Sequence, residues 1–333
     1  PPRKSGAVPE GRMPTASAFS LLDFAGLLAS GPPFLSADSG GIMESDERET
    51  FRVTLLGTGG PPPVMHRFGP STLVEAGGAK FLFDAGRGAM QRLYQLKIPF
   101  AEIDGLFLTH LHSDHVIGIP DLWLTGWLGQ AWGGRQVPLS VHGPSGTTAM
   151  MSHLEQAYQF DIQIRTHYPK DGVAVIADDF SGGVVYEKNG LKITAFEVDH
   201  GRVKPAFGYR IDYDGRSVVL SGDTCFNENV IGFSQGVDLL VHEVAATASE
   251  LLQTSSNARI IAGNHTTPEE AAEVFRRTSP KLAVYTHILQ FGGVTLDDMI
   301  DSTRRGYDGP FEVGEDLMAI DIGSNVEVRR FGP

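Results

Sequence analysis

Four residues that can bind a metal ion lie close together between positions 110 and 115, in the sequence His-Leu-His-Ser-Asp-His. Side chains alternate along a strand with a period of two, so His110 and His112 would point to the same side and could bind one ion. If the chain then turns into a helix, Asp114 and His115 move to a neighbouring position, where they could bind a second ion. Imidazole and carboxylate ligands suit zinc, and manganese or iron also accepts them.

Three further residues, His200, Asp223 and His287, each follow an apolar stretch that is typical of a strand. A loop after a strand can present a side chain at the edge of a sheet. Considered one at a time, each residue could equally be a polar group that ends a strand. Considered with the cluster at 110–115, they favour one metal-binding site assembled from distant parts of the chain.

The elements that must position these residues begin at Phe51, where short β-type runs alternate with longer amphipathic segments. Gly- and Pro-rich turns separate them. We expect strands at 51–56, 72–75, 80–83, 105–109, 139–142, 191–198, 207–213, 216–220, 238–242, 282–286, 317–320 and 325–330, and helices at 89–96, 117–130, 147–160, 268–277 and 296–304. Two similar halves of strands followed by helices predict an αββα sandwich, an α/β fold with two facing mixed sheets and helices outside.

The composition narrows the chemistry of the site. Of the 333 residues, 41% are hydrophobic, which is enough for a full core. The single cysteine, Cys225, excludes an intrachain disulfide and a cysteine-based zinc site, so a metal ion must be bound by histidines and carboxylates. The formal net charge of −13 argues against a surface that binds a nucleic-acid backbone. No run of about eighteen apolar residues occurs, so we expect no membrane span.

The first part of the chain differs from the rest. Basic residues precede an apolar stretch at 19–29, which loosely resembles a signal peptide, although Asp23 interrupts it. We therefore expect a leader or disordered tail at 1–45 and one hydrolase domain at 46–333. The protein would be cytoplasmic if it starts at Met43, and exported if the residues before Met43 contain a leader.

In their order and spacing, these motifs resemble the metallo-β-lactamase superfamily and, within it, the ribonuclease Z-like and arylsulfatase-like branch. The resemblance covers roughly residues 50–330. Besides the cluster at 110–115, it includes Leu56-Gly57-Thr58-Gly59, Phe83-Asp84-Ala85-Gly86, Gly143-Pro144, Val198-Asp199-His200, Gly208-Tyr209-Arg210, Ser221-Gly222-Asp223-Thr224, His242-Glu243 and Thr286-His287.

The resemblance implies a site for two zinc ions, with manganese or iron as alternatives. It divides the seven candidate ligands into His110, His112 and His200 on one ion, Asp114, His115 and His287 on the other, and Asp223 as a bridge between them. Two such ions about 3.5–4 Å apart lower the pKa of a bridging water, so that hydroxide can attack an ester bond. Asp114 could also orient that water or accept its proton.

The resemblance also suggests roles for three residues around the ligands. Asp84 would hold a ligand histidine through a hydrogen bond, although it could simply form a turn. His242-Glu243 and His265-Thr266-Thr267 resemble segments in which a Glu–His pair protonates the leaving oxygen. Glu243 would then orient His265, and His265 would be the general acid. The alternative for His265 is an exposed loop histidine.

Four more residues are candidates for contact with the substrate. Trp123 and Trp127 share a face of the expected helix at 117–130 and could line a cleft, although core packing is the more common role of such a face. His66 and Arg67 lie in a Pro-rich loop and could contact an anionic substrate, or could simply be solvated.

The predicted substrate is a small anionic or aromatic ester, either a phosphodiester or an aryl sulfate, cleaved by a homodimer. The tRNA-processing members of the branch carry a long arm where residues 211–221 form only a tight hairpin here, so RNA is disfavoured. The alternatives are a ribonuclease Z-type endoribonuclease and a β-lactam or lactone hydrolase. A redox di-iron enzyme is disfavoured because the oxygen-reducing relatives have Glu where His112 stands. A non-catalytic metal-binding module is also disfavoured, because the ligand set is complete.

Overall fold

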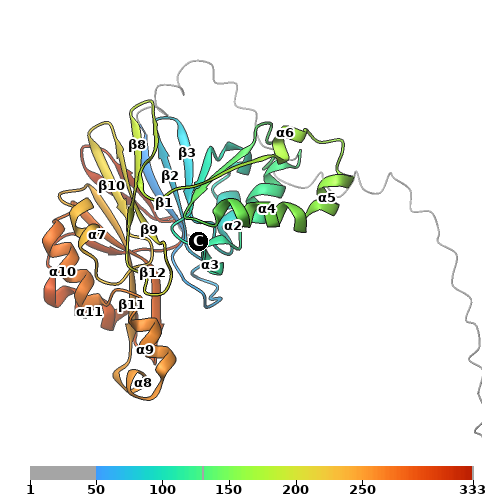
Figure 1. Cartoon of the computed structure of the whole chain (residues 1–333). Helices are drawn as coiled ribbons and strands as arrows, with labels where there is room; N and C mark the ends of the chain where they lie inside the picture. Colours follow the sequence, from blue (N-terminus) through green and yellow to red (C-terminus); the bar gives the residue numbers. More distant parts are fainter. Residues whose placement is uncertain (1–49, 130, 332–333) are drawn as a thin grey trace, which may run out of the picture. The chain divides into compact units, whose positions relative to one another are not determined.

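The computed structural model describes residues 50–129 and 131–331 of the chain. In this part, two β-sheets face each other and helices cover the outer faces of both (Figure 1). The predicted αββα sandwich is therefore confirmed. The leader or tail predicted at 1–45 lies outside the described residues.

Among the described residues, the first sheet has eight strands in the order β15-β14-β1-β2-β3-β4-β5-β6. The strands from β15 to β3 pair antiparallel, and those from β3 to β6 pair parallel. The strands are β1 Phe51–Gly57, β2 Ser71–Ala76, β3 Ala79–Phe83, β4 Gly105–Phe107, β5 Leu139–Gly143, β6 Val175–Asp179, β14 Ala319–Ile322 and β15 Val326–Arg329.

The second sheet has seven strands within the described part, in the order β13-β12-β11-β10-β9-β8-β7. The strands from β7 to β10 pair antiparallel, and those from β10 to β13 pair parallel. The strands are β7 Gly183–Lys188, β8 Leu191–Glu197, β9 Phe207–Tyr213, β10 Arg216–Leu220, β11 Leu239–Thr247, β12 Leu282–Phe291 and β13 Phe311–Val313.

Helices α2, α3 and α4 pack on the outer face of the first sheet, and α7, α10 and α11 on that of the second. The helices are α2 Ala89–Gln95, α3 Ser113–Val116, α4 Thr147–Ala157, α5 Gln159–Ile164, α6 Lys170–Val173, α7 Glu228–Phe233, α8 Ser249–Thr254, α9 Ser256–Ala262, α10 Pro268–Thr278 and α11 Leu296–Gly306, with a 3₁₀ turn, η1, at Phe100–Glu102 and a π-helical segment, η2, at Asp121–Thr125. Helices α8 and α9 extend beyond the end of β11 (Figure 1).

The main core lies between the sheets, where both contribute alternating apolar side chains. Phe83 stacks on Phe107 at a centroid distance of 5.3 Å, and Tyr209 packs edge-on against both rings. The buried Tyr209 hydroxyl donates to the Leu108 carbonyl at 2.5 Å. Because Leu108 lies two residues before His110, this contact ties the cluster at 110–115 to the second sheet.

Local signals in the sequence explain where α10 begins. The Thr267 side chain accepts a hydrogen bond from the Glu270 backbone, and the Glu270 carboxylate accepts one from the Thr267 backbone. This capping box, with Pro268 in the first turn, satisfies amide groups that a helix start leaves unpaired. Thr295 and Asp298 form the same arrangement at the start of α11.

The helix expected at 117–130 is not regular. Its middle, η2, is π-helical, and the buried Arg135 guanidinium donates to the carbonyls of Leu122 and Trp123 within it and to that of Phe100. Arg135 lies outside the expected helix, so its effect on the helix cannot be read from the local pattern. Residue 130 is not among the described ones.

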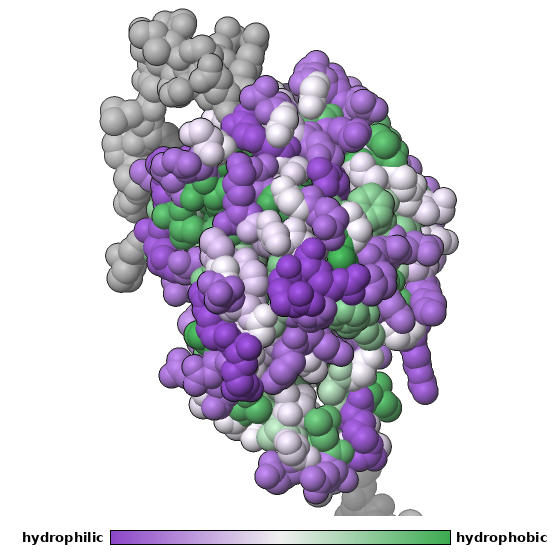
Figure 2. Space-filling model, turned by 90° about the vertical axis from the view of Figure 1, so that its left-hand side faces the viewer, coloured by the Kyte–Doolittle hydropathy of each residue, from purple (hydrophilic) through white to green (hydrophobic). Residues whose placement is uncertain are grey.

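The face that carries α7, α10 and α11 is mostly hydrophilic, and hydrophobic residues appear on it in small scattered groups (Figure 2). The apolar sides of helices α7, α10 and α11 face the second sheet. Within the described residues, no helix is both long and apolar enough to cross a membrane.

Candidate metal centre

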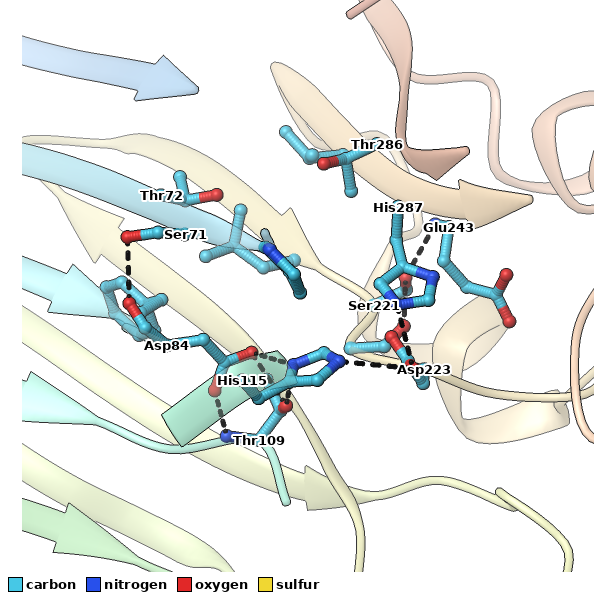
Figure 3. A pocket seen from close by; sticks show the side chains of 15 residues that line it. Ser71, Thr72, Asp84, Thr109, His115, Ser221, Asp223, Glu243, Thr286 and His287 are labelled. Carbon is cyan, nitrogen blue, oxygen red and sulfur yellow. Dashed lines mark hydrogen bonds and ion pairs between the residues drawn. The ribbon is translucent and has the colours of Figure 1, made fainter. Parts of the chain in front are cut away.

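The seven candidate ligands lie close together where several strands end. The 110–115 motif follows β4, His200 follows β8 and Asp223 follows β10, while His287 lies within β12. Figure 3 shows His115, Asp223 and His287 around one small cavity of about 40 Å³. Residues far apart in the chain thus share one site.

The first group consists of His110, His112, His200 and Asp223, and its potential ligand atoms all lie within 4.8 Å of one another. His112 Nδ1 is 2.9 Å from His110 Nε2 and 3.3 Å from His200 Nε2. Asp223 Oδ2 is 3.9 Å from His110 Nε2. His112 is the exposed member, so the site opens to solvent on its side.

The second group consists of Asp114, His115 and His287. Asp114 Oδ2 lies 3.6 Å from His115 Nε2 and 3.4 Å from His287 Nε2. Asp223 Oδ2 lies 3.3 Å from both of these nitrogens. Asp223 is therefore within reach of both groups.

The charges in this cluster fit a bound cation. Burial raises the pKa of Asp223, but His287 and His115 outweigh it and hold the pKa well below its usual range. Burial lowers the pKa of His110 well below its usual value, and His115 lowers it further. Asp223 is thus ionised and His110 neutral, which are the forms that bind metals. At His115 burial lowers the pKa, but Asp223 and Asp84 outweigh it and raise the pKa well above its usual value.

The buried His115 Nε2 gives a second indication of a cation. It faces Asp223 but makes no hydrogen bond. Buried polar atoms without a partner are uncommon, and a metal ion would supply the missing one. The histidines and aspartates therefore fit a metal site.

Asp84 fixes the orientation of His115. Its Oδ2 lies 2.7 Å from His115 Nδ1 and accepts from Thr109 Oγ1 at 2.8 Å, and its Oδ1 accepts from the Thr109 backbone at 2.9 Å (Figure 3). The other ring nitrogen of His115 then points toward Asp223. Such an outer hydrogen bond sets the tautomer and direction of a metal-binding histidine.

His287 owes its position to an irregularity in β12. Glu243 pairs with Thr286 and Val244 with Ile288, so His287 is an extra residue in the ladder. Its φ of 43° is unusual for a residue with a side chain. β-Bulges of this kind redirect side chains and are frequent beside active sites.

His265 and Glu243 form a buried pair beside both groups. Their side chains are 9% and 0% exposed, and His265 Nδ1 lies 3.1 Å from Glu243 Oε1. Burial lowers the pKa of His265, but Glu243 and Asp223 outweigh it and raise the pKa to about 9. The His265 ring contacts His200 of the first group and stacks on His287 of the second, with centroid distances of 5.0 and 5.5 Å.

The four residues predicted to contact the substrate do not line the metal centre in the way that the sequence suggests. Trp123 and Trp127 are 1% and 2% exposed, and their indole N–H groups donate to the Val173 and Pro169 carbonyls. Both rings pack in the core, so the prediction that they line a cleft is wrong. Arg67 donates through Nη1 to Thr58 Oγ1 and the Gly314 carbonyl, which favours a structural role, while His66 is exposed.

Two contacts around the site escape sequence reasoning. The Asn264 carbonyl lies 2.8 Å from His200 Nδ1 and orients that imidazole. The Thr58 carbonyl accepts from Ile288 N at 2.9 Å, next to the bulge at His287. Both contacts involve backbone oxygens, so no residue type in the sequence marks them. The position of Asn264 directly before His265 is the one feature of the sequence that points to it.

Comparison with known proteins agrees with the fold. A family described as "Beta-lactamase superfamily domain" matches residues 79–288. A Ribonuclease Z of Mycolicibacterium gilvum is 36% identical over 284 residues, covering 83% of this chain and 98% of that protein. A Ribonuclease Z of Mycobacterium avium is 35% identical over 278 residues, covering 82% and 98%. The structure of human tRNase Z, short form, superposes with a TM-score of 0.62 at 22% identity, covering 82% of this chain and 99% of that one.

These relatives contradict the prediction that the substrate is a small anionic or aromatic ester and that RNA is disfavoured, because they carry the name Ribonuclease Z. The β9–β10 hairpin does lack an arm. However, 284 aligned positions take up nearly all of the Mycolicibacterium protein, which leaves no room for a long insertion there either. The net charge describes the whole surface and says little about the site.

The matched family segment, the close relatives over most of their length, the αββα sandwich and the clustered histidines and aspartates all agree. The chain belongs to the β-lactamase superfamily and is a hydrolase with the metallo-β-lactamase fold.

Proposed function

We propose that this protein is a metal-dependent endoribonuclease of the ribonuclease Z type, which hydrolyses phosphodiester bonds in RNA. The observation that carries the proposal is the pairing of a seven-residue His/Asp cluster with a buried His–Glu pair that contacts both halves of it. The curated relatives named Ribonuclease Z support RNA as the substrate.

The seven residues would hold two zinc ions, with manganese or iron as alternatives, because all the donors are imidazoles and carboxylates. The two groups described above would each hold one ion, and Asp223 would contact both. Bound at these positions, the ions would lower the pKa of water toward neutrality and polarise the phosphoryl oxygens. Asp84 would keep His115 directed at its ion.

His265 would donate a proton to the leaving oxygen. Its Nδ1 is held by Glu243, which leaves Nε2 free for the substrate. With its pKa raised to about 9, the imidazole carries the required proton at neutral pH. The ring contacts one histidine from each ligand group, so its proton is delivered beside the centre.

Asp114 would accept a proton from the attacking water. Burial raises the pKa of Asp114, but the hydrogen bond from His287 and the charge of His115 outweigh it and lower the pKa. The carboxylate is therefore ionised at neutral pH and can act as a base.

The test uses the full chain loaded with zinc, with zinc content measured, and an end-labelled RNA with an unpaired 3′ extension. We expect cleavage by the wild type, none by Asp223→Ala, and normal cleavage by Asp301→Ala, which changes an exposed aspartate on α11. Because water attacks, a 2′-deoxy residue at the scissile position should still be cleaved. Cleavage that survives Asp223→Ala, or a zinc-loaded wild type without cleavage, would overturn the proposal.

A further inference from the structure

A pocket of about 600 Å³ lies between helix α2 and the π-helical segment η2. Four aromatic residues contribute to its lining, Phe68, Tyr94, Phe100 and Trp132, and we call it the aromatic pocket. Sites for small molecules usually measure about 300–1,000 Å³ and have apolar or aromatic walls. No step of the proposed hydrolysis uses this pocket.

Two of these rings, those of Tyr94 and Trp132, leave surface open for an occupant, whereas Phe100 is buried and the Arg92 guanidinium covers the Phe68 ring. Tyr94 is 52% exposed, and its ring meets Trp132 edge-on at a centroid distance of 6.2 Å. Exposed aromatic faces are the surfaces on which proteins stack single-stranded nucleobases, with little dependence on base identity. The walls therefore suit a flat heteroaromatic group.

The charges in the aromatic pocket select against a phosphate. Arg92 is the only cationic side chain among the described lining residues, and its Nη2 lies 2.9 Å from the Asp316 carboxylate. Its charge is thus neutralised, while Asp121 adds a carboxylate to another wall. An uncharged base could stack there and donate a hydrogen bond from its amino group to a carboxylate, as cytosine does in protein–nucleic acid complexes.

The loop at 58–68 connects the aromatic pocket to the metal centre. Asp316 accepts hydrogen bonds from the backbones of Thr58 and Phe68 and from Arg92. Thr58 in turn accepts from Ile288, beside His287, whereas Phe68 forms a wall of the pocket. One buried carboxylate therefore contacts both the residue that pairs with Ile288, next to His287, and two residues of the pocket wall.

The helical segment after the metal-binding motif makes a second connection. It leads from Asp114 to Asp121 over seven residues, through the end of α3 and a turn at 117–118. The pocket wall is formed where this segment becomes π-helical, at η2. π-Helical turns are rare in proteins overall, and those that occur are often found at functional sites.

We propose that the aromatic pocket binds one unpaired base of the RNA substrate while a nearby phosphodiester lies at the metal centre. This inference rests on the proposed ribonuclease function. The neutral base enters the pocket, and the charged backbone stays with the metal-binding residues.

The test titrates the zinc-loaded full chain with a fluorescein-labelled ten-nucleotide RNA. Fluorescence anisotropy on ice gives Kd, and gels of the same samples report cleavage. We expect Tyr94→Ala to raise Kd about tenfold, because one base stack is lost, and Tyr94→Phe to bind like the wild type. Phe160→Ala is the matched control, since it removes an aromatic ring that is 77% exposed on α5.

A series of RNAs with a single abasic residue then locates the base. At one position, the missing base should weaken binding to the wild type about tenfold but should have little further effect on Tyr94→Ala. If Tyr94→Ala binds with the wild-type Kd, or if its loss of affinity does not depend on any single base, the proposal that the pocket binds a base is wrong. RNA that is bound in this pattern but never cleaved would overturn the ribonuclease proposal instead.

Discussion

Replacing Glu243 by glutamine tests how the proton on His265 is held. The substitution keeps the size of the side chain and one acceptor oxygen but removes its charge. Glu243 is fully buried and 3.1 Å from His265, so solvent screens their interaction little. Burial alone lowers the pKa of His265, and without Glu243 we expect the pKa to fall from about 9 to its usual 6.5 or below.

The sign and size of the effect follow from the protonated fraction of His265. The acid form is the active one, so activity is lost as pH rises through this pKa, and Glu243→Gln moves that loss to lower pH. At pH 8, the active fraction falls on the order of thirtyfold, whereas at pH 6 it changes less than twofold. Bound metal ions would lower the pKa of His265 in both proteins by a similar amount, which moves both alkaline limbs to lower pH and leaves the direction and size of their separation unchanged.

The assay is the pH profile of kcat/KM for RNA cleavage between pH 5.5 and about 9.5. Glu155→Gln, at an exposed position on α4, is the matched control and should follow the wild type. A loss of the same factor at every pH would mean that Glu243 only supports the structure. An unmoved alkaline limb would refute His265 as the proton donor.

Three further substitutions test the parts around the centre. Asp84→Asn should lower zinc affinity about 10- to 100-fold in a chelator competition, because His115 loses the carboxylate that orients it, while Asp301→Asn should change nothing. Tyr209→Phe should lower the free energy of unfolding by about 1–2 kcal/mol in urea, because the Leu108 carbonyl loses its buried partner. Thr295→Ala should cost about 1 kcal/mol through the lost cap of α11, with kcat unchanged; a change in kcat would contradict its purely structural role.

The placement of the candidate ligands at strand ends could be predicted because its signals are local. Apolar runs before His110, His200 and Asp223 mark buried strands, and the ends of such strands lie at the edge of a sheet. The capping box at Thr267 likewise depends on residues within one turn. Short-range chemistry of this kind is readable without knowledge of the fold.

Other features depend on partners that are distant in the chain. Arg135 donates hydrogen bonds to two carbonyls of η2, and a bulge opposite Glu243 directs His287 into the site. The spacing of Trp123 and Trp127 shows that they share a helix face, but it cannot show that this face lies in the core. The edge strands β6 and β7 are largely exposed, so they lack the apolar alternation that would mark them.

The same distinction explains why the substrate is harder to derive than the reaction. The groups proposed for hydrolysis stand on or just after the strands of two packed sheets, and a cluster of imidazoles and carboxylates would serve many esters. Choice among substrates depends on surfaces such as the aromatic pocket, which joins Phe68, α2, η2 and Trp132. Because Asp316 anchors both Phe68 and the loop beside His287, the position of a bound base is tied to the position of the centre. Recognition and cleavage can therefore be coupled without an arm.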